Sequence, residues 1–159
     1  MHPVFTKLHA AGHPKLHVLN APESFHPAMQ TMQASATIFT ELRPNEQPTF
    51  LMTFATTQAE LGTFAQQCAR QTHGDAVIWV AYPKSTSKRY RCEFNRDSGW
   101  AAFGEHGFEP VRQVAIDEDW TALRLRRVGF IKSLTRAGAI SDEGRARIAA
   151  RRKNSSPVT

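Results

Sequence analysis

The chain has 159 residues, of which 41% are hydrophobic and 21% are charged. This composition excludes disorder of the whole chain, and at this length one hydrophobic core suffices. The formal net charge is +6, but residues 1–144 carry only +1, from 15 basic and 14 acidic side chains. The remaining five charges lie in the last fifteen residues, at Arg145, Arg147, Arg151, Arg152 and Lys153. We therefore expect a nearly neutral globular part with a basic, solvated terminal segment.

The two cysteines, Cys68 and Cys92, are too few for a disulfide framework, and neither has CxxC or Cys/His zinc spacing. Residues 1–5 are not followed by an apolar run of signal-peptide length, and no stretch approaches the length that spans a bilayer. We therefore expect a cytoplasmic protein that makes no contact with membranes.

The pattern along the chain predicts three parts: an irregular leader at 1–14, an α/β domain at 15–136, and a basic C-terminal helix with a frayed tail at 137–159. Six runs of β-branched, aromatic or apolar residues predict strands, at 15–19, 36–42, 49–55, 75–82, 111–116 and 120–126. The run at 49–55 is mainly apolar, as expected of a central strand with both faces covered. The last two runs are joined by a short acidic turn, which predicts an antiparallel hairpin.

The clearest helix begins at a Thr57 cap with Glu60 three residues on, and its apolar residues repeat at helical spacing until Gly74. Shorter helices are predicted at four other places: after Pro22, from a cap at Asn95 or Asp97, across Phe130 and Leu134, and from Ser141. The order of elements predicts a three-layer Rossmann-like α/β sandwich, with a mostly parallel sheet and an antiparallel edge hairpin.

Polar side chains follow three of the predicted strands: Asn20, Lys84 and Asp117. If these strands run in parallel, the three side chains lie at one rim of the sheet, where open α/β sheets bind ligands. A carboxamide, an ammonium and a carboxylate there predict a site for a polar or anionic small molecule. The alternative interpretation is that strand ends are simply polar, with Asn20 and Asp117 bonding turn amides.

No complete catalytic or nucleotide motif occurs in the sequence. The turn after the first strand reads VLNAPESF, which lacks the glycines of a standard dinucleotide or methyl-donor site. His9, His13 and His17 are spaced like one face of a helix, but Gly12 and Pro14 disfavour that helix. No carboxylate or cysteine joins them at ligand spacing, so no metal is expected, and the cofactor stays unassigned.

Two basic features allow more than one interpretation. The loop at 84–96 interleaves Tyr90 with basic residues, so this loop and the basic tail could bind nucleic acid or an acidic partner. Arg124 and Arg126 alternate with leucines on one predicted strand. They predict either a solvated face or, with Arg112, an anion clamp.

Four segments carry a family resemblance: VLNAP at 18–22, WVAYPK at 79–84, NRDSGW at 95–100 and VRQVAIDEDWTALRLRR at 111–127. Over roughly residues 15–136 the chain resembles a bacterial family known as a domain of unknown function. The resemblance implies a reduced Rossmann or methyltransferase-type sheet and brings no assigned reaction. The positions that match family motifs are Asn20, Lys84, Arg96, Asp97, Asp117, Trp120 and Arg124.

Three functions are compatible with these observations. The leading one is binding of a polar or anionic small molecule at the carboxyl-end rim, by Asn20, Lys84, Arg96, Asp97, Asp117 and Arg124. The second is an adaptor for nucleic acid or an acidic partner. The third is a degenerate methyltransferase-like enzyme or a hydrolase with Asp97 or Asp117 as base. Catalysis and oligomeric state stay open.

Overall fold

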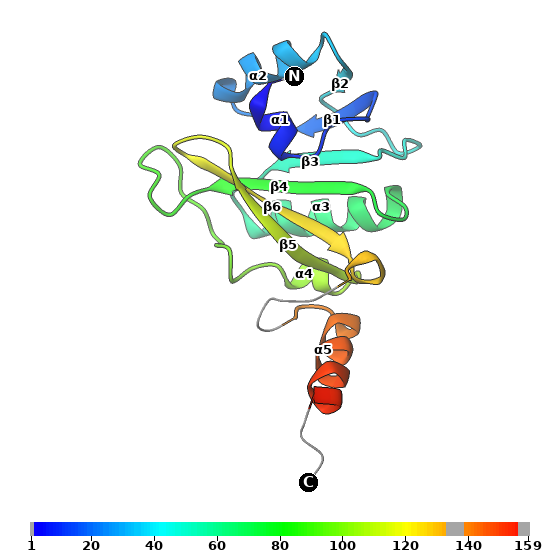
Figure 1. The fold of residues 1–159 in the computed structure, drawn as a ribbon. Helices are drawn as coiled ribbons and strands as arrows, with labels where there is room; N and C mark the ends of the chain where they lie inside the picture. The colour runs from blue at the N-terminus through cyan, green and yellow to red at the C-terminus, as the bar shows by residue number, and fades with distance from the viewer. Residues whose placement is uncertain (1, 133–138, 156–159) are drawn as a thin grey trace.

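A six-stranded sheet forms the middle layer of this computed structural model, which describes residues 2–132 and 139–155 (Figure 1). The strands are β1 (Lys15–Leu19), β2 (Thr37–Phe39), β3 (Phe50–Phe54), β4 (Val77–Pro83), β5 (Phe108–Ala115) and β6 (Trp120–Arg127). Their order in the sheet is β2-β1-β3-β4-β6-β5. The first four are parallel, whereas β6 is antiparallel to both β4 and β5. The predicted fold class, with its edge hairpin, is confirmed.

Helices cover both faces of this sheet. They are α1 (Pro3–Lys7), the 3₁₀ helix η1 (Glu23–Phe25), α2 (His26–Met32), α3 (Gln58–Gln71), α4 (Ala101–Gly104), the 3₁₀ helix η2 (Val128–Phe130) and α5 (Asp142–Ser155). Side chains of α1 and α2 pack on one face, and those of α3 and α4 pack on the other. We call these the α1 side and the α3 side. Helix α5 extends away from the sheet (Figure 1).

The two central strands supply most of the apolar contact between layers. Every residue of β3 and β4 is buried. Alternate residues of β4 serve opposite layers, so that Trp79 packs on the α1 side while Ile78 and Val80 pack on the α3 side. This double burial explains why both strands read as continuous apolar runs.

Helix α3 begins as the sequence predicts. The Thr57 hydroxyl accepts a hydrogen bond from the Glu60 amide at 3.2 Å, and the Glu60 carboxylate accepts from the Thr57 amide at 3.1 Å. The helix ends earlier than expected, at Gln71, with Thr72 as its C-cap. Gly74 instead takes a positive φ of 58° in the following turn.

The expectation of an irregular leader is wrong for residues 3–7, which form α1. The His2 ring caps the Val4 amide at 3.2 Å, and Pro3 suits the first turn. Val4, Phe5 and Leu8 are buried, and the carbonyl of Leu8 accepts the indole N–H of Trp79 at 2.8 Å. The helix is too short to show a period, so its apolar residues gave no helical signal.

The start of α4 also differs from the sequence prediction. Its N-cap is Trp100, without a side-chain cap, rather than Asn95 or Asp97. Asn95 instead closes its own turn, because its side-chain oxygen accepts the amide of Asp97 at 2.9 Å. The carbonyl of Asn95 accepts the indole N–H of Trp100 at 2.7 Å, which holds this turn against the core.

The C-terminal region agrees in part with the prediction. A helix was expected from Ser141, and α5 begins at Asp142 with two acidic residues in its first turn. The helix expected across Phe130 and Leu134 is a 3₁₀ turn at Val128–Phe130, and Leu134 lies outside the described residues. Fraying was expected from Asn154, but α5 continues to Ser155, and 156–159 lie outside the described residues. The division of the chain into parts at 15 and 137 stays a prediction.

Candidate functional site

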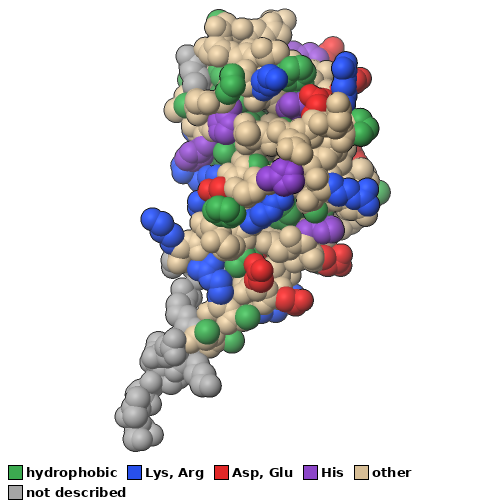
Figure 2. All heavy atoms as spheres, turned by 90° about the vertical axis from the view of Figure 1, so that its right-hand side faces the viewer, with side chains coloured by type: hydrophobic (Ala, Val, Ile, Leu, Met, Phe, Trp, Pro, Cys, Tyr) green, Lys and Arg blue, Asp and Glu red, His purple; other side chains and the backbone are tan. Residues whose placement is uncertain are grey.

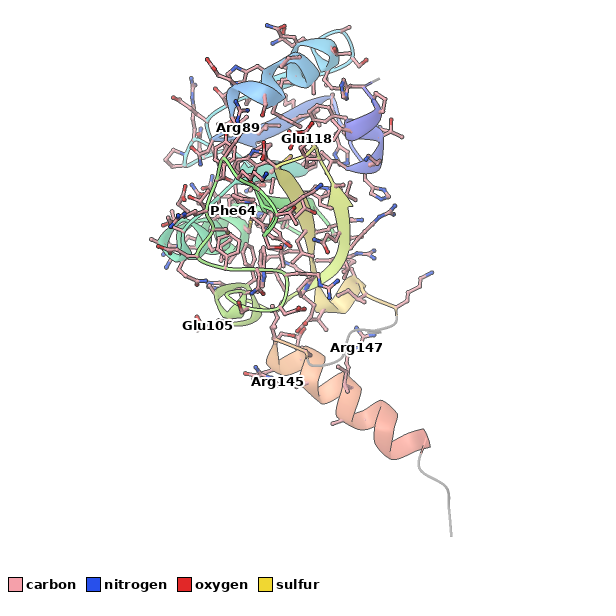
Figure 3. The ribbon with its side chains drawn as sticks, turned by 90° about the vertical axis from the view of Figure 1, so that its left-hand side faces the viewer. Phe64, Arg89, Glu105, Glu118, Arg145 and Arg147 are labelled. Atoms are coloured by element: carbon pink, nitrogen blue, oxygen red, sulfur yellow. The ribbon has the colours of Figure 1, made fainter. Side chains whose placement is uncertain are left out.

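Four segments meet at the rim where the parallel strands end. Strands β1, β3 and β4 run in the same direction, and the antiparallel β6 makes β5 run that way as well. The β5–β6 turn therefore lies at the same rim as the segments that follow β1, β3 and β4. Figure 2 looks at the opposite edge, where the parallel strands begin, and Figure 3 looks at this rim, with Arg89 and Glu118 labelled.

The six residues predicted to bind a ligand do not form one site. Lys84, Arg96 and Asp97 line one groove, which we call the rim groove. Asn20 lines a separate crevice. Asp117 lies in the β5–β6 turn, and Arg124 lies on the α1 side of β6, opposite Trp79. The rim brings the first three together. Strand order separates Asn20 from them, because β3 lies between β1 and β4. Asp117 lies at the same rim without lining the groove, and Arg124 lies on the other face of the sheet.

The rim groove lies between the segment at 84–98 and the ends of β4, β5 and β6, with a volume of about 1100 Å³. The floor of the groove is formed on the α3 side by three hydrogen-bonded polar side chains, those of Tyr82, Gln113 and Thr121. The Gln113 amide donates to the Tyr82 hydroxyl and to the Thr121 hydroxyl, both at 3.2 Å. These two bonds use both N–H groups of the amide and leave the Gln113 side-chain oxygen as an acceptor.

Two cations of the rim groove have no partner within the described part of the chain. The ammonium of Lys84, which is partly buried, and the exposed guanidinium of Arg91 make no hydrogen bond or ion pair there. Arg96 and Asp97 are adjacent and contact each other at 3.4 Å, with both side chains largely exposed. The groove thus offers positive charge above a floor of hydroxyl and amide groups.

Asp117 organises the β5–β6 turn. One of its carboxylate oxygens accepts the amides of Asp119 and Trp120, at 2.8 and 2.9 Å. These are the turn bonds that the alternative interpretation predicts for it. Within the described residues, Asp117 makes no hydrogen bond or ion pair with Lys84.

Asp119 ties the rim groove to the turn. Its carboxylate accepts the Ser87 hydroxyl at 2.7 Å, and its carbonyl accepts the Lys84 amide at 2.7 Å. Ser87 in turn accepts the amides of Arg89 and Tyr90, at 3.3 and 3.2 Å. The backbone that carries Lys84 is therefore fixed at several points. Asp119 gave no signal in the sequence beyond its place in an acidic turn.

Cys92 also lines the rim groove, but its thiol is unreactive there. Burial raises the pKa of its thiol, and the neighbouring carboxylates of Glu93 and Glu60 raise it further. A thiolate is the reactive form of cysteine, so this thiol stays protonated at neutral pH and is a poor nucleophile. Cys92 is therefore not a candidate nucleophile of the rim groove.

A second hollow, the switch crevice, lies where the strand connections diverge. The connection from β1 leads to α2 on the α1 side, whereas that from β3 leads to α3 on the other side. The crevice has a volume of about 700 Å³, and Asn20, Glu41 and Thr53 line it. Asn20 takes a positive φ of 59° and donates to the Thr53 hydroxyl at 3.3 Å. Asparagine tolerates this left-handed conformation, so the sharp turn forms without glycine.

The helix starts near the switch crevice leave little room for a phosphate. The η1 turn that precedes α2 follows Pro22, which has no N–H, and starts at the carboxylate of Glu23. At α3 the Glu60 carboxylate accepts the amides of Thr56 and Thr57, both at 3.1 Å, and Glu93 accepts the amide of Gln58 at 2.7 Å. Both starts already carry negative charge.

The predicted anion clamp of Arg124 and Arg126 does not form. Arg126 makes a two-point ion pair with Asp75, with both N–O distances 2.7 Å. Its hydrogen bond to Asp75 is the main cause that lowers the pKa of that carboxyl below the ordinary 3.8. Arg126 is therefore committed to a protein carboxylate, and a clamp on this face has to use Arg124 with other partners.

The Asp75–Arg126 pair predicts a pH dependence of stability. Because the folded-state pKa of Asp75 is depressed, its contribution is present above the unfolded pKa near 3.8 and is lost as pH falls through the folded value. Both side chains are about a third exposed, so solvent screening limits the effect to about 1 kcal/mol. Asp75→Asn should lower the free energy of unfolding in urea at neutral pH and make little difference at about pH 2. An equal loss at both pH values would contradict this.

The basic loop and the basic helix lie far apart. In Figure 3, Arg89 lies at the upper end of the rim, whereas Arg145 and Arg147 lie at the lower end, on α5. A ligand that contacts both would have to extend from Arg89 along the rim to α5. Arg147 also donates to the carbonyl of Val128 at 2.7 Å, so this guanidinium serves the docking of α5.

Comparison with known proteins leaves the family of the chain unassigned. No family model matches the chain, and no curated protein matches it. The structure of a putative type 11 methyltransferase from Sulfolobus solfataricus is 8% identical, with a TM-score of 0.43, over 78% of this chain and 75% of that one. The N-methyltransferase NodS from Bradyrhizobium japonicum WM9 is 10% identical, with a TM-score of 0.47, over 79% and 93% of the two chains. No residue role, cofactor or reaction is transferred at this distance.

None of the described helices combines the length and apolar character needed to cross a membrane. Within the same residues, no three His, Cys, Asp or Glu side chains come together as a metal site would need. Membership of the bacterial family of unknown function, like the cytoplasmic location, stays a prediction.

Proposed function

We propose that the protein binds a small organic acid in the rim groove, with Lys84 and Arg91 holding the anionic group. One observation carries this proposal. Two cations that have no partner among the described residues line the same groove as a polar floor. Charge-assisted hydrogen bonds from such groups are about twice as strong as neutral ones, so they favour a carboxylate over an uncharged ligand.

The floor suggests what the rest of the ligand carries. Gln113 uses both N–H groups within the protein and offers only its oxygen, which accepts hydrogen bonds. A ligand that donates there has a hydroxyl or amino group at some distance from its carboxylate. Hydroxy acids and amino acids have both features, and the groove is large enough for either.

This proposal predicts a selective effect of two substitutions on ligand binding. A panel of hydroxy acids and amino acids would be screened by thermal shift, and each hit measured by isothermal titration calorimetry. Lys84→Ala and Arg91→Ala should each weaken binding by about tenfold or more, because each removes a charge-assisted hydrogen bond.

The matched control is Lys88→Ala, which removes an exposed lysine of the same loop that does not line the groove. It should leave the affinity unchanged. The proposal fails if no acid of the panel binds, or if the double variant Lys84→Ala/Arg91→Ala keeps the affinity of the unaltered protein.

A second candidate is the degenerate methyltransferase, with a nucleoside-type methyl donor in the switch crevice. The position of Glu41 favours it, because a carboxylate about twenty residues after the first strand turn is a ribose-hydroxyl partner in dinucleotide sites. S-adenosylhomocysteine is the probe. Binding that is lost in Glu41→Ala and kept in Lys84→Ala would favour this candidate over the first, and absence of binding would exclude it.

A further inference from the structure

A cationic cluster lies on the α1 side of the edge hairpin, away from the rim groove. Its members are Arg112 of β5, Arg124 of β6, and His9 and His13 of the segment that follows α1. The floor of the rim groove lies on the opposite face of the same hairpin. Histidine side chains lie beside lysine and arginine side chains on the surface in Figure 2.

The two arginines of the cluster are direct cross-strand partners. Arg112 and Arg124 face each other in the β5–β6 register, so their side chains emerge on the same side of the sheet. Like charges at such positions repel each other. Helices α1 and α2 pack on this side of the sheet. Arg124 is partly buried there, whereas Arg112, on the edge strand β5, is exposed.

Arg124 lacks the acceptors that a buried guanidinium needs. Its Nε is buried and has no hydrogen-bond partner, and its other two nitrogens make no hydrogen bond to the described residues. Burial lowers the pKa of this guanidinium, and repulsion from Arg126 and Arg112 lowers it further. The nearby carboxylate of Asp75 is held by Arg126. An acceptor from outside the chain would satisfy these donors.

His9 is neutral in this arrangement. Its Nε2 lies 3.2 Å from a terminal nitrogen of Arg112, and a guanidinium only donates, so this ring nitrogen is the acceptor. Burial lowers the pKa of His9, and the charges of Arg124 and Arg112 lower it further. Burial and Arg124 act on His13 in the same direction. His9 also has a positive φ of 58°, a sparsely populated conformation for a non-glycine residue.

We propose that this cluster binds a small oxyanion of the sulfate or phosphate type, together with a proton taken up by His9 or His13. The anion supplies the acceptors that Arg124 lacks and offsets the repulsion between Arg112 and Arg124. Its negative charge also favours the protonated imidazoles, which the positive charges of the arginines disfavour. A protonated His9 no longer accepts from Arg112, so the guanidinium is released to bind the anion. The proton comes from solvent, and no covalent bond changes.

The charged groups around the cluster agree with this assignment. Besides its four members they are Lys7 of α1, Asp75 before β4 and Arg126 of β6. Lys7 donates to the carbonyl of Ala115 at 3.1 Å, and Asp75 and Arg126 neutralise each other. Two uncompensated guanidinium groups therefore remain where the histidines lie. This inference does not depend on the proposed function, because it uses the other face of the hairpin.

The test uses sulfate as the first probe, because its charge stays constant in the pH range where histidine titrates. Histidine ring signals of the full chain would be followed by NMR during sulfate titrations at about pH 6 and about pH 8. We expect shifts of the His9 and His13 signals. The affinity for sulfate should rise as pH falls, by up to about tenfold per pH unit for each proton taken up. A lack of shifts in both rings would overturn the proposal.

Variants separate the anion from the proton. Arg112→Gln, at an exposed position, should remove sulfate binding, and it decides the matter even if Arg124→Gln does not fold. His9→Asn, chosen because asparagine tolerates positive φ, combined with His13→Gln should keep weak binding but lose its pH dependence. Sulfate binding that survives Arg112→Gln, or pH dependence that survives the double histidine variant, would overturn the proposal.

Two controls place the anion and identify its source. Arg89→Gln and Lys88→Ala each remove an exposed cation of the loop at 84–98 that belongs neither to the cluster nor to the lining of the rim groove, so neither should change sulfate binding. Inorganic phosphate and methyl phosphate would then be compared with sulfate. Equal affinities point to a free anion, whereas methyl phosphate binding about tenfold tighter points to the phosphoryl group of a larger metabolite.

Discussion

Trp79→Ala should lower the free energy of unfolding by about 3–5 kcal/mol, a large part of the stability of a domain this size. The Trp79 side chain is fully buried in the middle of β4, between β3 and β6. Its removal opens a cavity under α1, and it leaves the carbonyl of Leu8 without its indole donor. Urea denaturation, or the yield of soluble protein where the variant does not accumulate, measures the loss.

Trp79→Phe helps to separate the two causes, because it keeps a buried aromatic ring while it removes the N–H together with part of the ring volume. We expect it to lose about 1–2 kcal/mol, which includes the unsatisfied carbonyl. Lys88→Ala on the exposed loop should stay within about 0.5 kcal/mol of the unaltered protein. A loss of under about 1 kcal/mol for Trp79→Ala would mean that α1 and the strand do not form one packed layer.

The central part of the fold follows from local sequence signals. β3 and β4 are buried on both faces, so their composition carries the signal without any knowledge of neighbours. Helix α3 has a complete capping box and a long apolar stripe, and both are local. The short acidic turn between β5 and β6 sets their antiparallel pairing in the same way. These elements were predictable because the cause and the effect lie within a few residues.

Helix α1 was not predictable in this way. Its five residues form less than two turns, and what holds them is contact with distant residues, such as that between Leu8 and Trp79. The predicted cap of α4 failed for a related reason. Asn95 has the side chain of a cap, but its own turn takes that oxygen first. Short elements depend on the tertiary structure, which a local pattern does not contain.

The sequence predicts that the candidate residues lie at one rim of the sheet, but it does not predict which of them line the same hollow. A strand end shows that Asn20 and Lys84 lie at the same edge, since β1 and β4 are parallel. It does not show that β3 lies between those strands, so that the two residues line different hollows. The alternation places Arg124 and its neighbouring leucines on opposite faces of β6, as observed, but the histidine neighbours of Arg124 come from the N-terminal segment, which the sequence assigned to a leader.

Glu109→Ala should release helix α5 from the domain while the sheet stays folded. The Glu109 carboxylate is buried in β5 and accepts the amide of Ile140 at 2.9 Å and the amide of Ser141 at 2.5 Å. Hydrogen bonds to a charged group contribute about 1.5–3 kcal/mol each, and the alanine leaves both amides unsatisfied. Tryptic cleavage at Arg145 and Arg147 should therefore accelerate by about a hundredfold or more if it follows the opening of the helix. Tryptophan fluorescence of the sheet core should not change.

Gly104→Ala tests the same docking from the other side. A Cβ at Gly104 would clash with the carbonyl oxygen of Ile140, so the segment before α5 has to move away. We expect the same faster cleavage as in Glu109→Ala, although all the hydrogen-bonding groups remain. The matched control is Gly62→Ala in α3, where a Cβ meets nothing within 4 Å and helix propensity should raise stability by about 0.5–1 kcal/mol. If Glu109→Ala and Gly104→Ala are cleaved no faster than Gly62→Ala, then neither contact holds α5, and Arg147 with its bond to Val128 becomes the anchor to test.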